Sequence, residues 1–158
     1  MFTLWTVRLA CVFYVLALAA WAANRPRTAR VAWTAGMLFF LLHVVAAFSF
    51  HHHWSHEAAY RETARQTAEL FGFDWGGGLY FNYVFTALWA LDAAWMWIRP
   101  LSYGHRPRWI AAAIHGFLAF MFFNGAIVFG SSAVRWPSVA AIPVLAAIWL
   151  GSRHRAPA

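Results

Sequence analysis

Long apolar runs alternate with short polar connections along most of this 158-residue chain. A helix needs about 20 apolar residues to cross the hydrocarbon core of a bilayer, and five runs come close to that length. The fifth run is interrupted by Arg135, Pro137 and Pro143, so it either spans the membrane or re-enters on one side. We therefore expect an all-α transmembrane bundle, a single integral membrane domain over residues 1–158, with five spans or four. The expected spans cover about 4–23, 31–50, 79–98, 109–129 and 131–150.

One polar segment, residues 51–78, separates the second apolar run from the third. Ser55 can cap a helix that carries Glu57 in its first turn, and Gly72 can end it. Between these residues, apolar side chains recur every three or four positions on one face, and charged side chains occupy another. This pattern predicts an amphipathic helix that lies on the outer membrane surface.

The composition fits a membrane protein, with 63% hydrophobic and 11% charged residues. The net charge of +7 comes from arginines, which sit mostly in short connections between apolar runs. A nucleic-acid-binding surface would gather its basic residues beside polar ones, so nucleic acid is not an expected partner. The chain has no lysine, which excludes a retinal Schiff base and a P-loop. The expected partners are the lipid bilayer and either other membrane proteins or further copies of this chain.

Arginine positions also predict an orientation, because connections on the cytoplasmic side carry more basic residues. Arginines cluster in 24–30, in 99–108 and in 153–155, three segments that five alternating spans place on one side. The opposite side carries fewer arginines together with four acidic residues. We therefore expect a multi-pass protein of a bacterial-type inner membrane, with the N-terminus and loop 51–78 outside and the C-terminus in the cytoplasm.

Histidines gather at the start of the polar segment and suggest a metal site. Imidazole is the commonest transition-metal ligand in proteins, and Cu, Fe or Zn would suit a set of imidazole and carboxylate ligands. If the preceding helix continued, one turn would separate His52 from His56 and His53 from Glu57. The alternative is a hydrated cap on the second span that binds no metal. The candidate metal ligands are His52, His53, His56 and Glu57.

Two polar residues lie at one expected depth inside the membrane. Asp92 and His115 are each six residues from the cytoplasmic end of their spans, so they can meet. Such a pair could relay protons, or the carboxylate could orient a histidine that binds a cofactor. The alternative is a structural pair that fixes helix packing. Asp92 belongs to a heptad-like seam that we expect to face the bundle, formed by Asn82, Phe85, Trp89, Asp92 and Met96.

His43 is the other intramembrane histidine, in the outer half of the second span. His43 and His115 are the only pair that could bind a b-type haem inside the membrane, but their expected depths differ, so haem b is disfavoured. The box formed by His52, His53 and His56 resembles those of membrane fatty-acid desaturases and hydroxylases. Those families spread several boxes over the cytoplasmic face, whereas this chain has one box, expected outside, so a di-iron oxygenase is not expected.

Small residues form a stripe along the fourth expected span, at Ala112, Gly116, Ala119 and Ala126. Such a stripe favours close contact with a neighbouring helix.

Three functions remain open from the sequence. The first is binding of a transition metal or redox cofactor by the outer histidines, supported by the polar residues His43, Asp92 and His115. The second is a cofactor-free accessory subunit that packs its aromatic helices against other membrane proteins. The third is a small proton-coupled transporter that uses Asp92 and His115. Whether the protein is an enzyme does not follow from the sequence.

Overall fold

The structure is a computed structural model that describes residues 1–153, apart from the side chains at 149, 152 and 153. Within that range every regular element is a helix, which confirms the all-α part of the prediction. Arg155, part of the predicted cytoplasmic tail, lies outside the described residues. The elements are α1 (Phe2–Ala22), α2 (Pro26–Phe50), α3 (His56–Phe71), α4 (Gly78–Ile98), α5 (Pro100–Gly104), α6 (Arg108–Phe123), the π-helix η1 (Asn124–Val128) and α7 (Ser132–Arg153).

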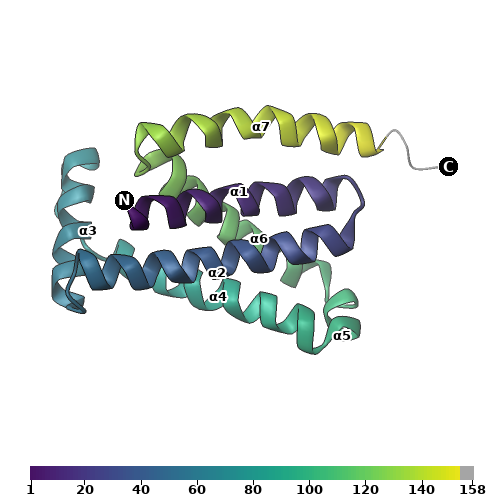
Figure 1. Ribbon diagram of the computed structural model, residues 1–158, viewed down its shortest axis with the longest axis horizontal. Helices are drawn as coiled ribbons and strands as arrows, with labels where there is room; N and C mark the ends of the chain where they lie inside the picture. The colour runs from purple at the N-terminus through teal and green to yellow at the C-terminus, as the bar shows by residue number, and fades with distance from the viewer. Residues whose placement is uncertain (154–158) are drawn as a thin grey trace.

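The long helices run side by side along the long axis of the molecule (Figure 1). α1 packs against α2 and α7, and α4 packs against α2 and α6. α3 crosses one end of this bundle, near the N-terminus, and α5 lies at the opposite end (Figure 1). The α1–α2 connection and the end of α7 lie at the same end as α5 (Figure 1). The arginine-rich connections 24–30 and 99–108 therefore share one end of the molecule, as their alternation predicted.

Three segments are long and apolar enough to cross a membrane: α1, α2 and the continuous run Arg108–Val128 formed by α6 with η1. The other two expected spans are found as helices, but they are not both long and apolar enough to count as membrane spans in the same way. α4 has 21 residues but includes Asn82, Asp92 and several tryptophans and tyrosines. α7 carries Arg135 and two internal prolines, and its apolar part is the shorter stretch Ser132–Ile148. The count of five spans is therefore not confirmed.

The bundle core is built from large aromatic side chains set against small residues. Trp33 of α2 and Trp89 of α4 are fully buried, and their rings lie 5.3 Å apart between centroids. A Cβ atom at Gly36 would lie 3.0 Å from Cζ2 of Trp89, so glycine lets α2 and α4 approach closely. The buried core cluster contains Tyr14, Ala17, Ala32, Trp33, Phe85, Trp89, Ala93, Met96 and Leu118.

The predicted seam of α4 is mostly correct. Phe85, Trp89, Asp92 and Met96 are buried, whereas Asn82 is exposed. Most of the small-residue stripe, on α6, faces outward instead of making a helix contact, whereas Ala126 of η1 is buried. Ala112, Gly116 and Ala119 are exposed, and Leu118 is the buried residue of that helix. Leu118 belongs to the same buried cluster as Phe85 and Trp89 of α4.

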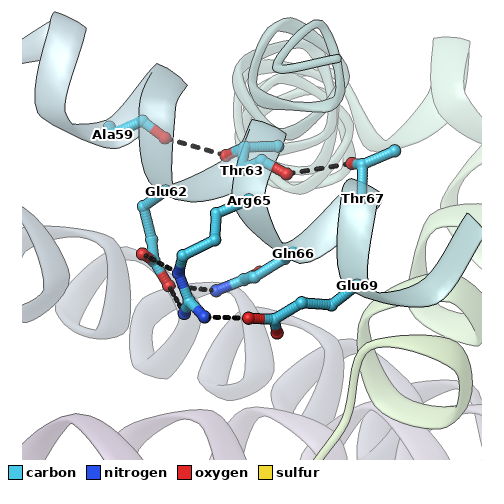
Figure 2. A network of polar contacts seen from close by, with 7 residues as sticks. All are labelled: Ala59, Glu62, Thr63, Arg65, Gln66, Thr67 and Glu69. Carbon is cyan, nitrogen blue, oxygen red and sulfur yellow. Dashed lines mark hydrogen bonds and ion pairs between the residues drawn. The ribbon is translucent and has the colours of Figure 1, made fainter. Parts of the chain in front are cut away.

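The predicted amphipathic helix is present as α3, with the expected ends. The Ser55 hydroxyl accepts a hydrogen bond from the backbone N–H of Ala58 at 3.1 Å, and Gly72 ends the helix with a φ of +79°. On the polar face, Arg65 lies between Glu62 and Glu69 and pairs with both carboxylates, while Gln66 donates to Glu62 (Figure 2). The charged side chains of α3 therefore pair with one another, and the apolar face of the helix can pack against the end of the bundle.

Candidate functional site

Asp92 of α4 is a buried carboxylate, with 2% of its surface exposed. Its Oδ2 atom accepts two hydrogen bonds, from Nε1 of Trp33 at 3.0 Å and from the hydroxyl of Tyr103 at 3.2 Å. Its Oδ1 atom is buried and has no hydrogen-bond partner. A buried polar atom without a partner costs about 1–3 kcal/mol, so this oxygen is an open acceptor that the fold maintains at a cost.

His115 of α6 lies beside the ring of Trp33. Its ring centroid is 5.3 Å from that of Trp33 and 5.4 Å from that of Trp21. Nε2 of His115 is 3.0 Å from Nη2 of Arg106. A guanidinium can only donate hydrogen bonds, so Nε2 must accept. His115 in this structure is therefore the neutral imidazole with its proton on Nδ1.

Arg106 contacts both His115 and Tyr103. Its guanidinium carbon lies 3.6 Å from the centre of the Tyr103 ring, and the hydroxyl of that tyrosine donates to Asp92. Nε of Arg106 is buried without a hydrogen-bond partner. We refer to Trp33, Asp92, Tyr103, Arg106 and His115 together as the Asp92 centre.

Local sequence explains how the segment after α4 reaches back over Asp92. Pro100 occupies the first turn of α5, where its missing N–H is no loss, and Pro107 caps the start of α6. The short α5 between them carries Tyr103 against α4. Burial raises the pKa of Tyr103, and the nearby Asp92 carboxylate raises it too, so the phenol keeps its proton and donates to Asp92.

Asp92 and His115 thus share one centre, as their expected depths suggested, although no hydrogen bond joins them directly. Trp33 contacts both, by its Nε1 atom and by its ring. The sequence did not point to Trp33, Tyr103 or Arg106. Their signal was indirect, because a buried carboxylate needs donors and these residues lie at the end of the bundle that Asp92 approaches.

The histidines between α2 and α3 do not share a helix with His56. α2 ends at Phe50 and α3 begins at His56, and the connection between them includes His53 and Trp54 at φ of +49° and +58°. His52 packs against the ring of Phe48, with 5.6 Å between centroids. The one-turn spacing considered for His52 with His56 is therefore not found.

The remaining candidate ligands have other contacts. Nδ1 of His56 lies 3.0 Å from the hydroxyl of Tyr83, and Glu57 pairs with Arg61 at 2.6 Å. His53 is exposed. In the part of the chain that the structure describes, no group of three or more His, Cys, Asp or Glu side chains is arranged to hold a metal ion. Partial burial lowers the pKa of His52, as do the charges of His51 and His53, against the opposing effect of Glu62.

His43 lies far from the Asp92 centre. Its Nδ1 atom donates to the backbone oxygen of Thr3, at the start of α1. Trp21, which contacts His115, lies near the other end of the same helix, about 27 Å away at 1.5 Å per residue. His43 and His115 therefore cannot bind the two faces of one haem.

Comparison with models of known families, with curated proteins and with solved structures finds no match. A buried carboxylate with one open oxygen, next to a neutral imidazole, is an arrangement that can accept and pass on a proton.

Proposed function

We propose that this protein takes up and releases a proton at the Asp92 centre inside the membrane, as a small proton-coupled transporter or channel does. The observation that carries the proposal is the open Oδ1 atom of Asp92. Ionisable residues inside membrane bundles commonly mark proton relays. The fold keeps this acceptor open although Trp33 and Tyr103 both reach the same carboxylate.

The surroundings of Asp92 favour a proton over a larger ligand. The residue is only 2% exposed, and Trp33 beside it is fully buried, so there is no room for a bulky solute at the carboxylate. The charged and titratable groups around it are Tyr103 of α5, Arg106 of the following connection and His115 of α6. Together they offer an acceptor, a neutral imidazole and a fixed positive charge.

The proposal includes the membrane topology. In it, α4 and α7 cross the bilayer together with the three apolar spans, in a bacterial-type inner membrane. The N-terminus and loop 51–78 lie outside, and the C-terminus lies in the cytoplasm. The shared end of the two arginine-rich connections supports this orientation. The Asp92 centre then lies toward the cytoplasmic side, within reach of the segment that carries α5.

The test is proton flux into vesicles that contain the purified protein and an internal pH-sensitive dye. Under an imposed pH gradient and membrane potential, we expect flux at least about tenfold above that of the Asp92→Asn and His115→Gln variants, which remove the acceptor groups. Asp74→Asn is the matched control, because it removes an exposed acid in the outer loop and should leave the flux unchanged.

A coupled transporter leaks few protons without its solute, so an infrared titration of the same proteins accompanies the flux measurement. The wild type should gain a carboxylic-acid band on acidification that Asp92→Asn lacks and Asp74→Asn keeps. If flux and band are the same in the wild type and in a folded Asp92→Asn variant, the proposal is wrong.

A second candidate function is binding of Cu, Fe or Zn at the outer face through His52, His53, His56 and Glu57. The observation in its favour is that the short connection between α2 and α3 carries His51, His52 and His53 in succession, with His56 at the start of α3. Metal analysis of the tag-free protein tests it. Bound metal should be lost when His52 and His56 are both changed to alanine and kept in Asp92→Asn. A metal-free wild type after reconstitution would exclude this function.

A further inference from the structure

Two complementary atoms in the Asp92 centre are unpaired. Oδ1 of Asp92 is a buried acceptor without a donor, and Nε of Arg106 is a buried donor without an acceptor. Buried unpaired groups of opposite kind normally pair when they can reach each other. Here both groups border Tyr103, because the guanidinium of Arg106 stacks on the face of its ring and the tyrosine hydroxyl donates to the Asp92 carboxylate.

Two hydrogen bonds hold Arg106 in its present position. Its Nη1 atom donates to the backbone oxygen of Tyr103 at 3.3 Å, and its Nη2 atom donates to Nε2 of His115 at 3.0 Å. The hydrogen bond to His115 exists only while His115 is neutral, because a protonated imidazole has no lone pair to offer and carries a positive charge. A proton on Nε2 of His115 therefore breaks the bond and repels the guanidinium.

Resting on the proposed function, we propose that Arg106 exchanges partners within the centre. It binds Nε2 of His115 while that imidazole is neutral, and it moves to Oδ1 of Asp92 when Nε2 takes a proton. The incoming proton forms the new N–H bond on His115, and Arg106 keeps all of its own protons throughout. The free acceptor of the centre is then Oδ1 in one state and Nε2 in the other, so the position of Arg106 decides where the next proton can bind.

The other groups that face His115 are compatible with this exchange. α1 and α2 present the uncharged rings of Trp21 and Trp33, and α4 presents the carboxylate of Asp92. Tyr103 of α5 remains a donor to Oδ2 of Asp92 in both states. After the exchange, the guanidinium of Arg106 donates to Oδ1 of Asp92. The positive charge of protonated His115 then lies beside the ion pair of Arg106 and Asp92.

The test follows three signals in one pH titration of the full-length protein in lipid nanodiscs. Nitrogen-15 NMR reports protonation of His115 and the environment of the Arg106 guanidinium, and infrared spectroscopy with isotope-labelled aspartate reports the carboxylate band of Asp92. In the wild type we expect the Arg106 signals and the Asp92 band to shift together with protonation of His115. Arg106→Gln should abolish the shift of the Asp92 band while His115 still titrates.

Two further variants control the measurement. Arg108→Gln removes an exposed arginine two residues away and should keep the shift. Arg106→Lys keeps a positive charge that can still reach a single carboxylate oxygen, so the shift should return and show that the centre folds. A shift that persists in Arg106→Gln, or wild-type Arg106 signals that stay constant while His115 titrates, would overturn the exchange and leave the proposed function standing. If neither His115 nor Asp92 titrates, both fail.

Discussion

At the scale of single residues, the buried oxygen without a hydrogen-bond partner, Oδ1 of Asp92, lies in the core that also contains the largest buried side chains. An apolar residue at that position would leave the N–H of Trp33 and the hydroxyl of Tyr103 without their acceptor. The carboxylate instead fixes the orientation of Trp33 and draws Tyr103 back onto α4. Replacing a buried partner of such a network leaves the other groups unsatisfied, so Asp92 constrains several elements at once.

A prediction at this scale concerns the glycine that lets the loop after α3 close. A Cβ atom at Gly76 would lie 2.5 Å from the backbone oxygen of Tyr60, closer than any contact allows. We expect Gly76→Ala to lower the free energy of unfolding by about 1–3 kcal/mol, measured by denaturation of the detergent-solubilised protein.

Gly116→Ala is the matched control for that measurement. Nothing lies within 4 Å of a Cβ at Gly116, which is inside α6. This change should stabilise the protein by about 0.5–1 kcal/mol, because alanine favours the helix. Equal effects of the two substitutions would contradict the predicted contact at Gly76.

The sequence predicted some residues of the centre and missed others for a physical reason. Asp92 and His115 were predictable, because a charge or an imidazole in an apolar run is costly and therefore conspicuous. Trp33 and Arg106 were not, because tryptophans and arginines are ordinary at the ends of membrane helices. Only the contact between α2, α4 and α5 distinguishes these two from their neighbours. Asn82 was wrongly placed on the buried seam, since the heptad spacing does not follow the 3.6-residue period of α4 over its full length.

At the scale of elements, α3 was the most predictable part of the fold. Its ends depend on local chemistry, a serine cap and a glycine with positive φ, which the sequence shows directly. The histidines before it were less predictable. Whether His52 and His56 align depends on the backbone at His53 and Trp54, and both residues adopt positive φ there. Positive φ is uncommon for residues other than glycine, so the sequence did not predict this turn.

A prediction for α3 concerns pH. The hydrogen bonds from Arg65 lower the pKa of Glu62 below its ordinary value of 4.5. The stabilisation from this carboxylate is therefore present above pH 4.5 and is lost as the pH falls through the lower, folded-state pKa. At neutral pH, hydrogen exchange of the α3 amides should be faster in Glu62→Gln than in the wild type, by on the order of two-fold.

The same comparison at acidic pH serves as its own control. Once Glu62 is protonated in the wild type, the two proteins should exchange at equal rates at any one pH. A difference that persists unchanged under acidic conditions would mean that the charge of Glu62 does not support α3.

At the scale of the whole molecule, arginine spacing predicted which connections share an end of the bundle, but the predicted number of spans is not confirmed. The connections alternate between the two ends of the bundle as predicted (Figure 1). α4, however, contains several tryptophans and tyrosines. Because these side chains carry a polar N–H or O–H, the stability of α4 within a membrane depends on the hydrogen-bond partners that neighbouring helices supply. Packing against α2 and α6 decides the place of such a helix, and a single sequence does not show that packing.

The proposed topology is tested by labelling single cysteines in a Cys11→Ala background. Leu101 in α5 is 79% exposed, and Gln66 in α3 is exposed at the opposite end of the bundle. In intact cells, a membrane-impermeant maleimide should label Gln66→Cys, and it should label Leu101→Cys only after the membrane is made permeable. The reverse pattern would place loop 51–78 in the cytoplasm, and labelling of both in intact cells would contradict a spanning bundle.

The indole rings of Trp21 and Trp33 lie within 5.4 Å of the His115 ring, measured between centroids. A protonated imidazole at such a distance quenches the fluorescence of an indole, whereas a neutral one does so weakly. The protein therefore carries its own optical reporter, because each change of charge on His115 alters the light that these two tryptophans emit.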